Sequence, residues 1–108
     1  MEKIKLVGKT TVTAETVIYL RAESNYSEVF LTSGKIVILS KTLKKLESVL
    51  EPFGFFRTHK SYLVNLKHVV SSSVYDEQDQ IKLTNNHRVD LSRRRKSEFL
   101  EIKKRRLI

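Results

Sequence analysis

The first two-fifths of the chain consists of β-branched stretches separated by short polar segments. Residues 9–14 and 15–22 are rich in Thr, Val and Ile, which favours strands. Residues 27–32 and 35–40 lie on either side of a Ser-Gly pair at 33–34, where the Gly can adopt the positive φ of a tight turn. The pattern predicts four strands, the last two forming a hairpin.

The spacing of apolar residues then changes from strand-like to helical. Four of them recur on one face of a helix: Leu43, Leu46, Val49 and Leu50. Ser40 or Thr42 can cap the first turn, and Pro52 with Gly54 can end the helix. We expect a short amphipathic helix lying on a sheet.

The middle of the chain has a less regular pattern. Residues 55–59 are compatible with a strand or a turn, and residues 61–65 with a tight turn or a single helical turn. Residues 67–75 are compatible with a strand that contains a run of three Ser. We expect strand content to continue through this region.

The last third predicts a hairpin followed by a helix. Residues 80–84 and 87–91 flank an Asn-Asn pair at 85–86, and Asn tolerates the left-handed conformation of a two-residue turn. Ser92 can cap a final helix from Arg93 to about Arg105, whose apolar contacts would come from Phe99, Ile102 and Leu107. The whole pattern predicts one mainly β domain with one or two short helices.

Basic charge is concentrated near the C-terminus. The 108 residues carry a formal net charge of +9, from 21 Lys and Arg against 12 Asp and Glu. Nine of the basic residues and only three of the acidic ones lie between His87 and Ile108. Such a block indicates a polyanionic partner, which can be nucleic acid or an anionic membrane surface.

Several classes of protein are disfavoured by the sequence. The chain has no Cys, which excludes disulfides and thiolate metal sites and fits the reducing cytoplasm, where we expect the protein to be. No apolar run is long enough for a signal peptide or a membrane span. Basic residues 103–106 precede Leu107 and Ile108, but this stretch has too thin an apolar face for a membrane partner to be expected.

Catalytic and metal-binding patterns are missing as well. His59, His68 and His87 are far apart, and no pair has the spacing of metal ligands on one element. The three Gly residues form no phosphate-binding loop, and there is no Gly-x-Ser-x-Gly motif. We therefore expect neither an enzyme nor a cofactor or metal.

The segment Ser92 to Lys96 favours nucleic acid over the membrane. Its four adjacent cations begin a predicted helix, where free N–H groups attract phosphate but the helix dipole disfavours positive side chains. An anionic partner would relieve that crowding, although a solvated basic helix start is the alternative. Arg, Asn and Lys can also read base edges, and the loops 23–27 and 59–61 supply such groups.

Three stretches of the chain carry a family resemblance. They are residues 18–26 (Ile-Tyr-Leu-Arg-Ala-Glu-Ser-Asn-Tyr), 56–69 (Phe-Arg-Thr-His-Lys-Ser-Tyr-Leu-Val-Asn-Leu-Lys-His-Val) and 89–95 (Val-Asp-Leu-Ser-Arg-Arg-Arg). In this order and spacing they resemble the early strand and loop, the core motif and the closing Ser-Arg element of the LytTR family. Residues 41–46 stand where that family has a short helix. The family supplies the output domains of many bacterial response regulators.

The resemblance implies a fold and a mode of binding. The fold is an elongated stack of small antiparallel β-sheets with short helices, in a single domain over residues 1–108. Its core would span about residues 7–100, and a basic C-terminal helix or tail would span residues 93–108. Such domains insert loops into successive major grooves of duplex DNA, usually at paired repeats. We expect sequence-specific double-stranded DNA binding for transcription regulation, as the output domain of a two-component response regulator.

Individual roles also follow from the resemblance. The implied base contacts are Asn25, Lys60 and Arg94, and the implied phosphate contacts are Ser61, Ser92, Arg93 and Arg95. The scaffold of the central loop would consist of His59, Tyr62, Val64 and Asn65, and Arg57 fits the scaffold or a DNA contact. Two positions depart from the family: Arg21 stands where an acid is common, and Asn85-Asn86 replaces Asn-Gly.

The alternative function is an RNA-binding or protein-interaction module on a small β fold. Tyr26 and Tyr62 could then stack on single-stranded bases. For the DNA-binding function, the implied partners are a second copy of the chain on paired sites and a receiver domain in a longer parent chain. Paired sites would gain affinity through linkage.

Overall fold

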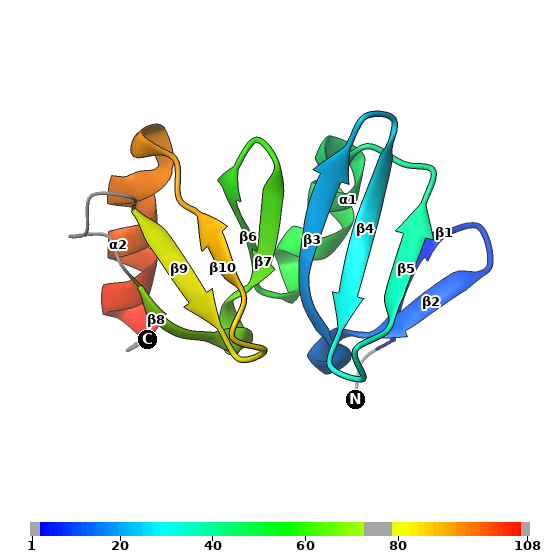
Figure 1. Cartoon of the computed structure of the whole chain (residues 1–108), viewed down its shortest axis with the longest axis horizontal. Helices are drawn as coiled ribbons and strands as arrows, with labels where there is room; N and C mark the ends of the chain where they lie inside the picture. The colour runs from blue at the N-terminus through cyan, green and yellow to red at the C-terminus, as the bar shows by residue number, and fades with distance from the viewer. Residues whose placement is uncertain (1–2, 73–78, 107–108) are drawn as a thin grey trace.

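The computed structural model describes residues 3–72 and 79–106. These residues form three antiparallel β-sheets arranged along the longest axis, with two α-helices packed against them (Figure 1). The molecule measures 40 × 31 × 24 Å, so it is elongated. The predicted stack of small antiparallel sheets is confirmed.

The central sheet has the strand order β5–β4–β3–β7–β6. Its strands are β3 (Val17–Glu23), β4 (Tyr26–Leu31), β5 (Ile36–Leu39), β6 (Phe55–His59) and β7 (Tyr62–Asn65). β4 and β5 pair as the predicted hairpin, and Gly34 in the connecting turn has a φ of 90°, which a residue with a Cβ rarely adopts. A short 3-10 helix, η1 (Ala14–Thr16), leads into β3.

Two smaller sheets flank the central one. The first consists of β1 (Lys3–Val7) and β2 (Thr10–Thr13), and the other of β8 (Val69–Ser72), β9 (Gln80–Leu83) and β10 (Arg88–Asp90). β9 and β10 confirm the second predicted hairpin, and Asn86 in its turn has a φ of 68°. β8 starts later than predicted, because residues 66–68 form a 3-10 turn, η3 (Leu66–His68). Residues 73–75 of that predicted strand lie outside the described residues.

Helix α1 (Leu43–Leu50) is capped by Thr42, whose hydroxyl accepts a hydrogen bond from the Lys45 amide. A 3-10 turn, η2 (Glu51–Phe53), and Gly54 at a φ of 86° end it. Leu43, Leu46 and Leu50 are buried. Val49 is 36% exposed, so the predicted apolar face was one residue too wide. The helix meets the sheet along a narrow stripe, and Val49 lies beyond it.

Helix α2 (Lys96–Arg106) follows a 3-10 turn, η4 (Arg93–Arg95). Ser92 caps this turn as predicted, because its hydroxyl accepts a hydrogen bond from the Arg95 amide. Phe99 is fully buried and Ile102 packs partly against the core. Leu107 lies outside the described residues.

The central sheet separates two hydrophobic clusters. The cluster on one face contains Ile18, Tyr19, Phe56, Val64, the third sheet and Phe99 of α2. The cluster on the other face contains Val17, Leu20, Phe55, Leu63, α1 and the β1–β2 sheet. Neighbouring residues of β6 and β7 therefore point into opposite clusters, β3 contributes residues to both clusters, and both faces of these strands are covered.

Burial on both faces explains why the sequence-based prediction missed strand β7. Residues 61–65 were expected to form a turn or a helical turn, but Tyr62–Asn65 is strand β7 between β3 and β6. A four-residue strand that is covered on both sides shows no alternation of apolar and polar residues. Only its pairing with β3 and β6 identifies it as a strand.

Candidate nucleic-acid interface

Three turns lie along one edge of the molecule. The β3–β4 turn, the β6–β7 turn and η4 follow the upper edge in Figure 1, parallel to the longest axis. They carry Asn25, Lys60 and Arg94, whose side chains are all exposed. Two hydrogen bonds join neighbours along this edge: the Ala22 amide donates to the Ser61 carbonyl at 2.9 Å, and the Ser92 amide to the Thr58 carbonyl at 2.7 Å. The fold thus brings together residues that are up to 69 positions apart in sequence.

The β3–β4 turn is braced by ion pairs of Arg21. Its guanidinium lies 2.7 Å from the Glu28 carboxylate and 3.5 Å from that of Glu23, and it stacks 5.5 Å from the centroid of the Phe30 ring. The hydrogen bond to Glu28 raises the pKa of Arg21 above its usual value. Arg21 is therefore paired with Glu28. The carboxylate of Glu28 balances the positive charge that Arg21 places where the family often has an acid.

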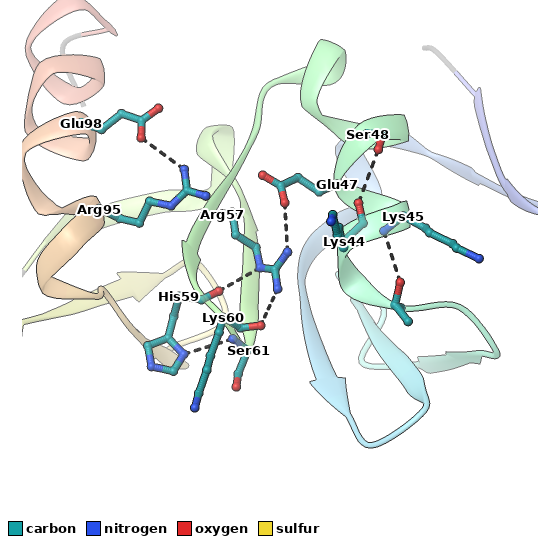
Figure 2. Close-up of polar contacts among 11 residues, drawn as sticks. Lys44, Lys45, Glu47, Ser48, Arg57, His59, Lys60, Ser61, Arg95 and Glu98 are labelled. Carbon is teal, nitrogen blue, oxygen red and sulfur yellow. Dashed lines mark hydrogen bonds and ion pairs between the residues drawn. The ribbon is translucent and has the colours of Figure 1, made fainter.

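The β6–β7 turn is held by the guanidinium of Arg57. Its Nε donates to the carbonyl of His59 at 2.9 Å, and a terminal nitrogen donates to the carbonyl of Lys60. The other terminal nitrogen pairs with Glu47 of α1 at 2.9 Å (Figure 2). A planar guanidinium can satisfy three acceptors at fixed angles, so this single side chain joins the turn to the helix.

The residues assigned to the scaffold make short contacts within the same turn. The His59 Nδ1 accepts a hydrogen bond from the Ser61 amide at 3.1 Å, and the His59 ring lies 5.9 Å from that of Tyr62. Val64, a further scaffold residue, is fully buried. These contacts restrict the backbone on both sides of Lys60, which itself is exposed at the tip.

Asn65 ties the far end of β7 to the start of β3. Its side-chain amide is buried and donates to the carbonyls of Ala14 at 3.1 Å and Val17 at 2.9 Å. Its side-chain oxygen accepts a hydrogen bond from the Lys67 amide at 3.1 Å. The amide thus satisfies three backbone groups that the strand ladder leaves free.

The cations of η4 differ in their surroundings. Arg95 pairs with Glu98 at 3.2 Å (Figure 2). Its guanidinium also lies 6.0 Å from the centroid of the Phe56 ring. Arg93 and Arg94 are exposed and have no partner among the described residues. Ser92 uses its hydroxyl oxygen as the cap of η4. The turn therefore exposes two cations to solvent, whereas the third is paired with Glu98 of α2.

A cleft of about 300 Å³ lies between α1, the β6–β7 turn and η4. It is lined by Lys44, Glu47, Arg57, His59, Lys60, Ser92, Arg94 and Arg95. Five of these side chains are cationic and only one is a carboxylate. A concave surface with such an excess of positive charge suits a phosphate backbone.

The three His residues have structural partners rather than a shared site. The His87 Nδ1 lies 2.7 Å from the Tyr19 hydroxyl, and burial raises the pKa of that phenol to about 12. The His68 ring nitrogens lie 2.7 Å from the Glu15 carbonyl and 2.8 Å from the Thr84 hydroxyl. Within residues 3–72 and 79–106, no group of three His, Cys, Asp or Glu is placed to hold a metal ion.

Sequence reasoning did not identify Lys44 or Glu47 as part of this site. Both lie on the polar face of a short amphipathic helix, where charged residues are ordinary. Only the packing of α1 beside β6 brings them to the cleft. No helix in the described part of the chain is long and apolar enough to cross a membrane.

A stack of small β-sheets with exposed polar and basic turns along one edge fits a nucleic-acid-binding domain of the β class. The family of LytTr DNA-binding domains matches residues 8–104, and the chain belongs to this family. Its members are defined by DNA binding and not by catalysis.

Two known proteins illustrate the relationship. The chain is 40% identical over 72 residues to the CO-responsive transcriptional regulator RcoM of Rhodospirillum rubrum, covering 64% of this chain and 30% of that protein. The chain thus spans less than a third of this curated relative. Its fold matches the LytTr domain of a protein described as a methyl-accepting/DNA response regulator from Bacillus cereus. That match has a TM-score of 0.70 and 22% identity over 95% of this chain and 93% of the other.

Proposed function

We propose that this domain binds specific sequences of double-stranded DNA and thereby regulates transcription. The observation that carries the proposal is the alignment of three exposed turns along one edge of a 40 Å molecule, next to a cleft with five cations and one carboxylate. A turn of B-DNA is about 34 Å long, so turns spread along such an edge can reach successive major grooves on one face of the duplex.

In this proposal the exposed tips read bases and the neighbouring polar groups hold phosphates. Asn25, Lys60 and Arg94 reach base edges because each lies at the tip of a separate turn. The phosphate contacts are Ser61, Ser92, Arg93 and Arg95. Ser92 already caps η4 and Arg95 is already paired with Glu98. Of these residues, Arg93 should therefore contribute most to phosphate binding.

The wider context of the domain belongs to the same proposal. Since the relative RcoM is more than three times as long as the matched segment, we infer that this domain acts within a larger regulator, such as one with a receiver domain. Two copies bind paired repeats, because one small domain covers only one half-site and linkage of two sites adds affinity.

Selection from random duplex DNA at about 150 mM salt tests the function directly, because this salt suppresses non-specific phosphate binding. Enrichment of a short motif that recurs about one helical turn away is expected. Binding that fades with salt and enriches no motif would contradict sequence-specific recognition. A preference for single strands over duplex would instead favour base stacking on Tyr26, which is 39% exposed beside Asn25.

The first variant to measure is Arg94→Ala on the selected site. The expected loss is about 1–3 kcal/mol of binding free energy, with relaxed preference at one base position, because Arg reads guanine bidentately. Arg93→Ala is the matched control and should weaken all sequences alike. An equal loss on all sequences for Arg94→Ala would make Arg94 a phosphate contact.

A further inference from the structure

Three cations from three different elements line the cleft and have no partner in the part of the chain that the structure describes. Lys44 comes from α1, Lys60 from the β6–β7 turn and Arg94 from η4. None of the three side chains forms a hydrogen bond or ion pair among the described residues. The other two cations of the cleft, Arg57 and Arg95, are paired with Glu47 and Glu98.

The excess positive charge of this cleft therefore comes from α1 as well as from the two turns. The single carboxylate of the cleft, Glu47, is already engaged by Arg57 at 2.9 Å. Like charges that converge in a concave surface repel one another and attract a polyanion. Lys44 contributes to this field although it lies outside the three motifs that carry the family resemblance.

The position of Lys44 relative to the β6–β7 turn is fixed by its own helix. Lys44 and Glu47 are three residues apart, so they lie on the same side of α1. Glu47 in turn holds Arg57, which binds the carbonyls of His59 and Lys60 (Figure 2). The helix and the turn thus form one unit that can meet DNA together.

We propose that Lys44 binds a backbone phosphate of the duplex, so that α1 forms the third wall of the DNA interface. This inference rests on the proposed function, because the phosphate belongs to the DNA strand beside the groove that Lys60 and Arg94 enter. Lys44 supplies charge and affinity there and carries no sequence preference, as expected of a contact to phosphate.

Lys45 provides a matched control on the same helix. It is exposed like Lys44, carries the same charge and does not line the cleft. Figure 2 shows its side chain directed away from the turn that carries Lys60. Lys44→Gln and Lys45→Gln therefore remove the same charge from the same helix at two different places.

The experiment measures the affinity of the whole chain for its selected duplex as a function of salt, for wild type, Lys44→Gln, Lys45→Gln and Lys44→Arg. Loss of one phosphate contact should reduce the slope of log affinity against log salt by about 0.9. The loss of affinity of Lys44→Gln relative to wild type should therefore become about 3.5-fold smaller between about 50 and 200 mM salt. Lys45→Gln and Lys44→Arg should keep the wild-type slope, and the Lys44→Gln deficit should be the same on a scrambled duplex.

The inference is overturned if Lys44→Gln keeps the wild-type slope, or if both Gln variants lower the slope equally, because general charge would then explain the effect. It is also overturned if Lys44→Gln weakens only the selected site, which would indicate a base contact. In each of these cases the wild-type chain still binds duplex, so the proposed function stands. Failure of the wild-type chain to bind any duplex would refute both. Thermal unfolding of each variant confirms that the fold is retained.

Discussion

Two buried polar side chains at this site, Asn65 and Thr58, are expected to affect stability in opposite ways, because only the first has hydrogen-bond partners among the described residues. The amide of Asn65 is fully engaged with three backbone groups. The hydroxyl of Thr58, also buried, has no partner among the described residues. A satisfied polar group in a core is costly to remove, whereas an unsatisfied one is costly to keep.

This contrast gives a prediction for two substitutions. Asn65→Ala should lower the free energy of unfolding by about 3 kcal/mol, because it leaves two carbonyls and one amide without their partner. Thr58→Val preserves shape and should leave stability unchanged or raise it by about 1 kcal/mol. Urea denaturation measures both. A loss for Thr58→Val as large as that for Asn65→Ala would contradict the assignment of Thr58 as unsatisfied.

The sequence identified the chemistry of these residues but not all of their partners. The motif around His59 and Asn65 indicated a scaffold, and the structure assigns both to backbone hydrogen bonds. The partners of Asn65, Ala14 and Val17, lie about 50 residues earlier and are backbone groups. Backbone groups leave no signature in the sequence, so such a contact could not be predicted.

At the scale of elements, the important unit is α1 together with the β6–β7 turn. Arg57 was compatible with the scaffold or with DNA, and its three hydrogen bonds within the protein favour the scaffold. Glu47 of α1, 10 residues before Arg57, holds one end of the guanidinium. The conformation of the turn that carries Lys60 therefore depends on this helix. We infer that Arg57 positions Lys60 and does not itself contact DNA.

Arg57→Lys tests this positioning role. Lys keeps the charge but cannot reproduce the planar fork, so preference for the selected site over a scrambled duplex should fall roughly tenfold, or about 1.4 kcal/mol. The salt slope should stay at the wild-type value, because no phosphate contact is lost. Unchanged preference would show that only the charge of Arg57 matters.

Glu47→Ala tests the same unit in a second way. Whether this substitution raises or lowers the affinity for DNA distinguishes two explanations of the role of Glu47. If Glu47 were only a negative charge near DNA, its removal would strengthen binding. If it holds Arg57 in place, removal should weaken binding to the selected site. Competition between selected and scrambled duplexes in a mobility-shift assay distinguishes the two outcomes.

The secondary-structure prediction identified several elements from their turn residues or from a clear period of apolar residues, and it missed strand β7. The hairpin at residues 26–39 was recognised from its Ser-Gly turn and its β-branched residues. Helix α1 and the hairpin at residues 80–90 show clear periods of buried and more exposed positions. Strand β7 has none, because it is covered on both faces.

At the scale of the whole molecule, the edge that carries the three turns predicts the shape of the DNA footprint. The turns are spread along the longest axis, which extends 40 Å, slightly more than one turn of B-DNA. Guanine methylation interference on the selected site should therefore reveal contacts in separate major-groove segments on one face of the duplex, about 10 base pairs apart. A single continuous segment would mean that only one turn enters a groove.

The sequence by itself determined the class of the domain and most of its elements, and it predicted a set of groups for contact with DNA. Local periods, turn residues and the order of three motifs are properties of contiguous residues, and contiguous residues are what a sequence presents directly. The concentration of charge near the C-terminus likewise needed no structure to indicate a polyanionic partner.

The tertiary structure decided which charges face the same space and which are already paired. Arg21, Arg57 and Arg95 are paired with Glu28, Glu47 and Glu98, whereas Lys44, Lys60 and Arg94 meet at one cleft with no partner among the described residues. These groupings join residues from separate elements, because the central sheet orders its strands differently from the chain. Spatial convergence of distant residues depends on packing, and packing is not encoded in any single stretch of the sequence.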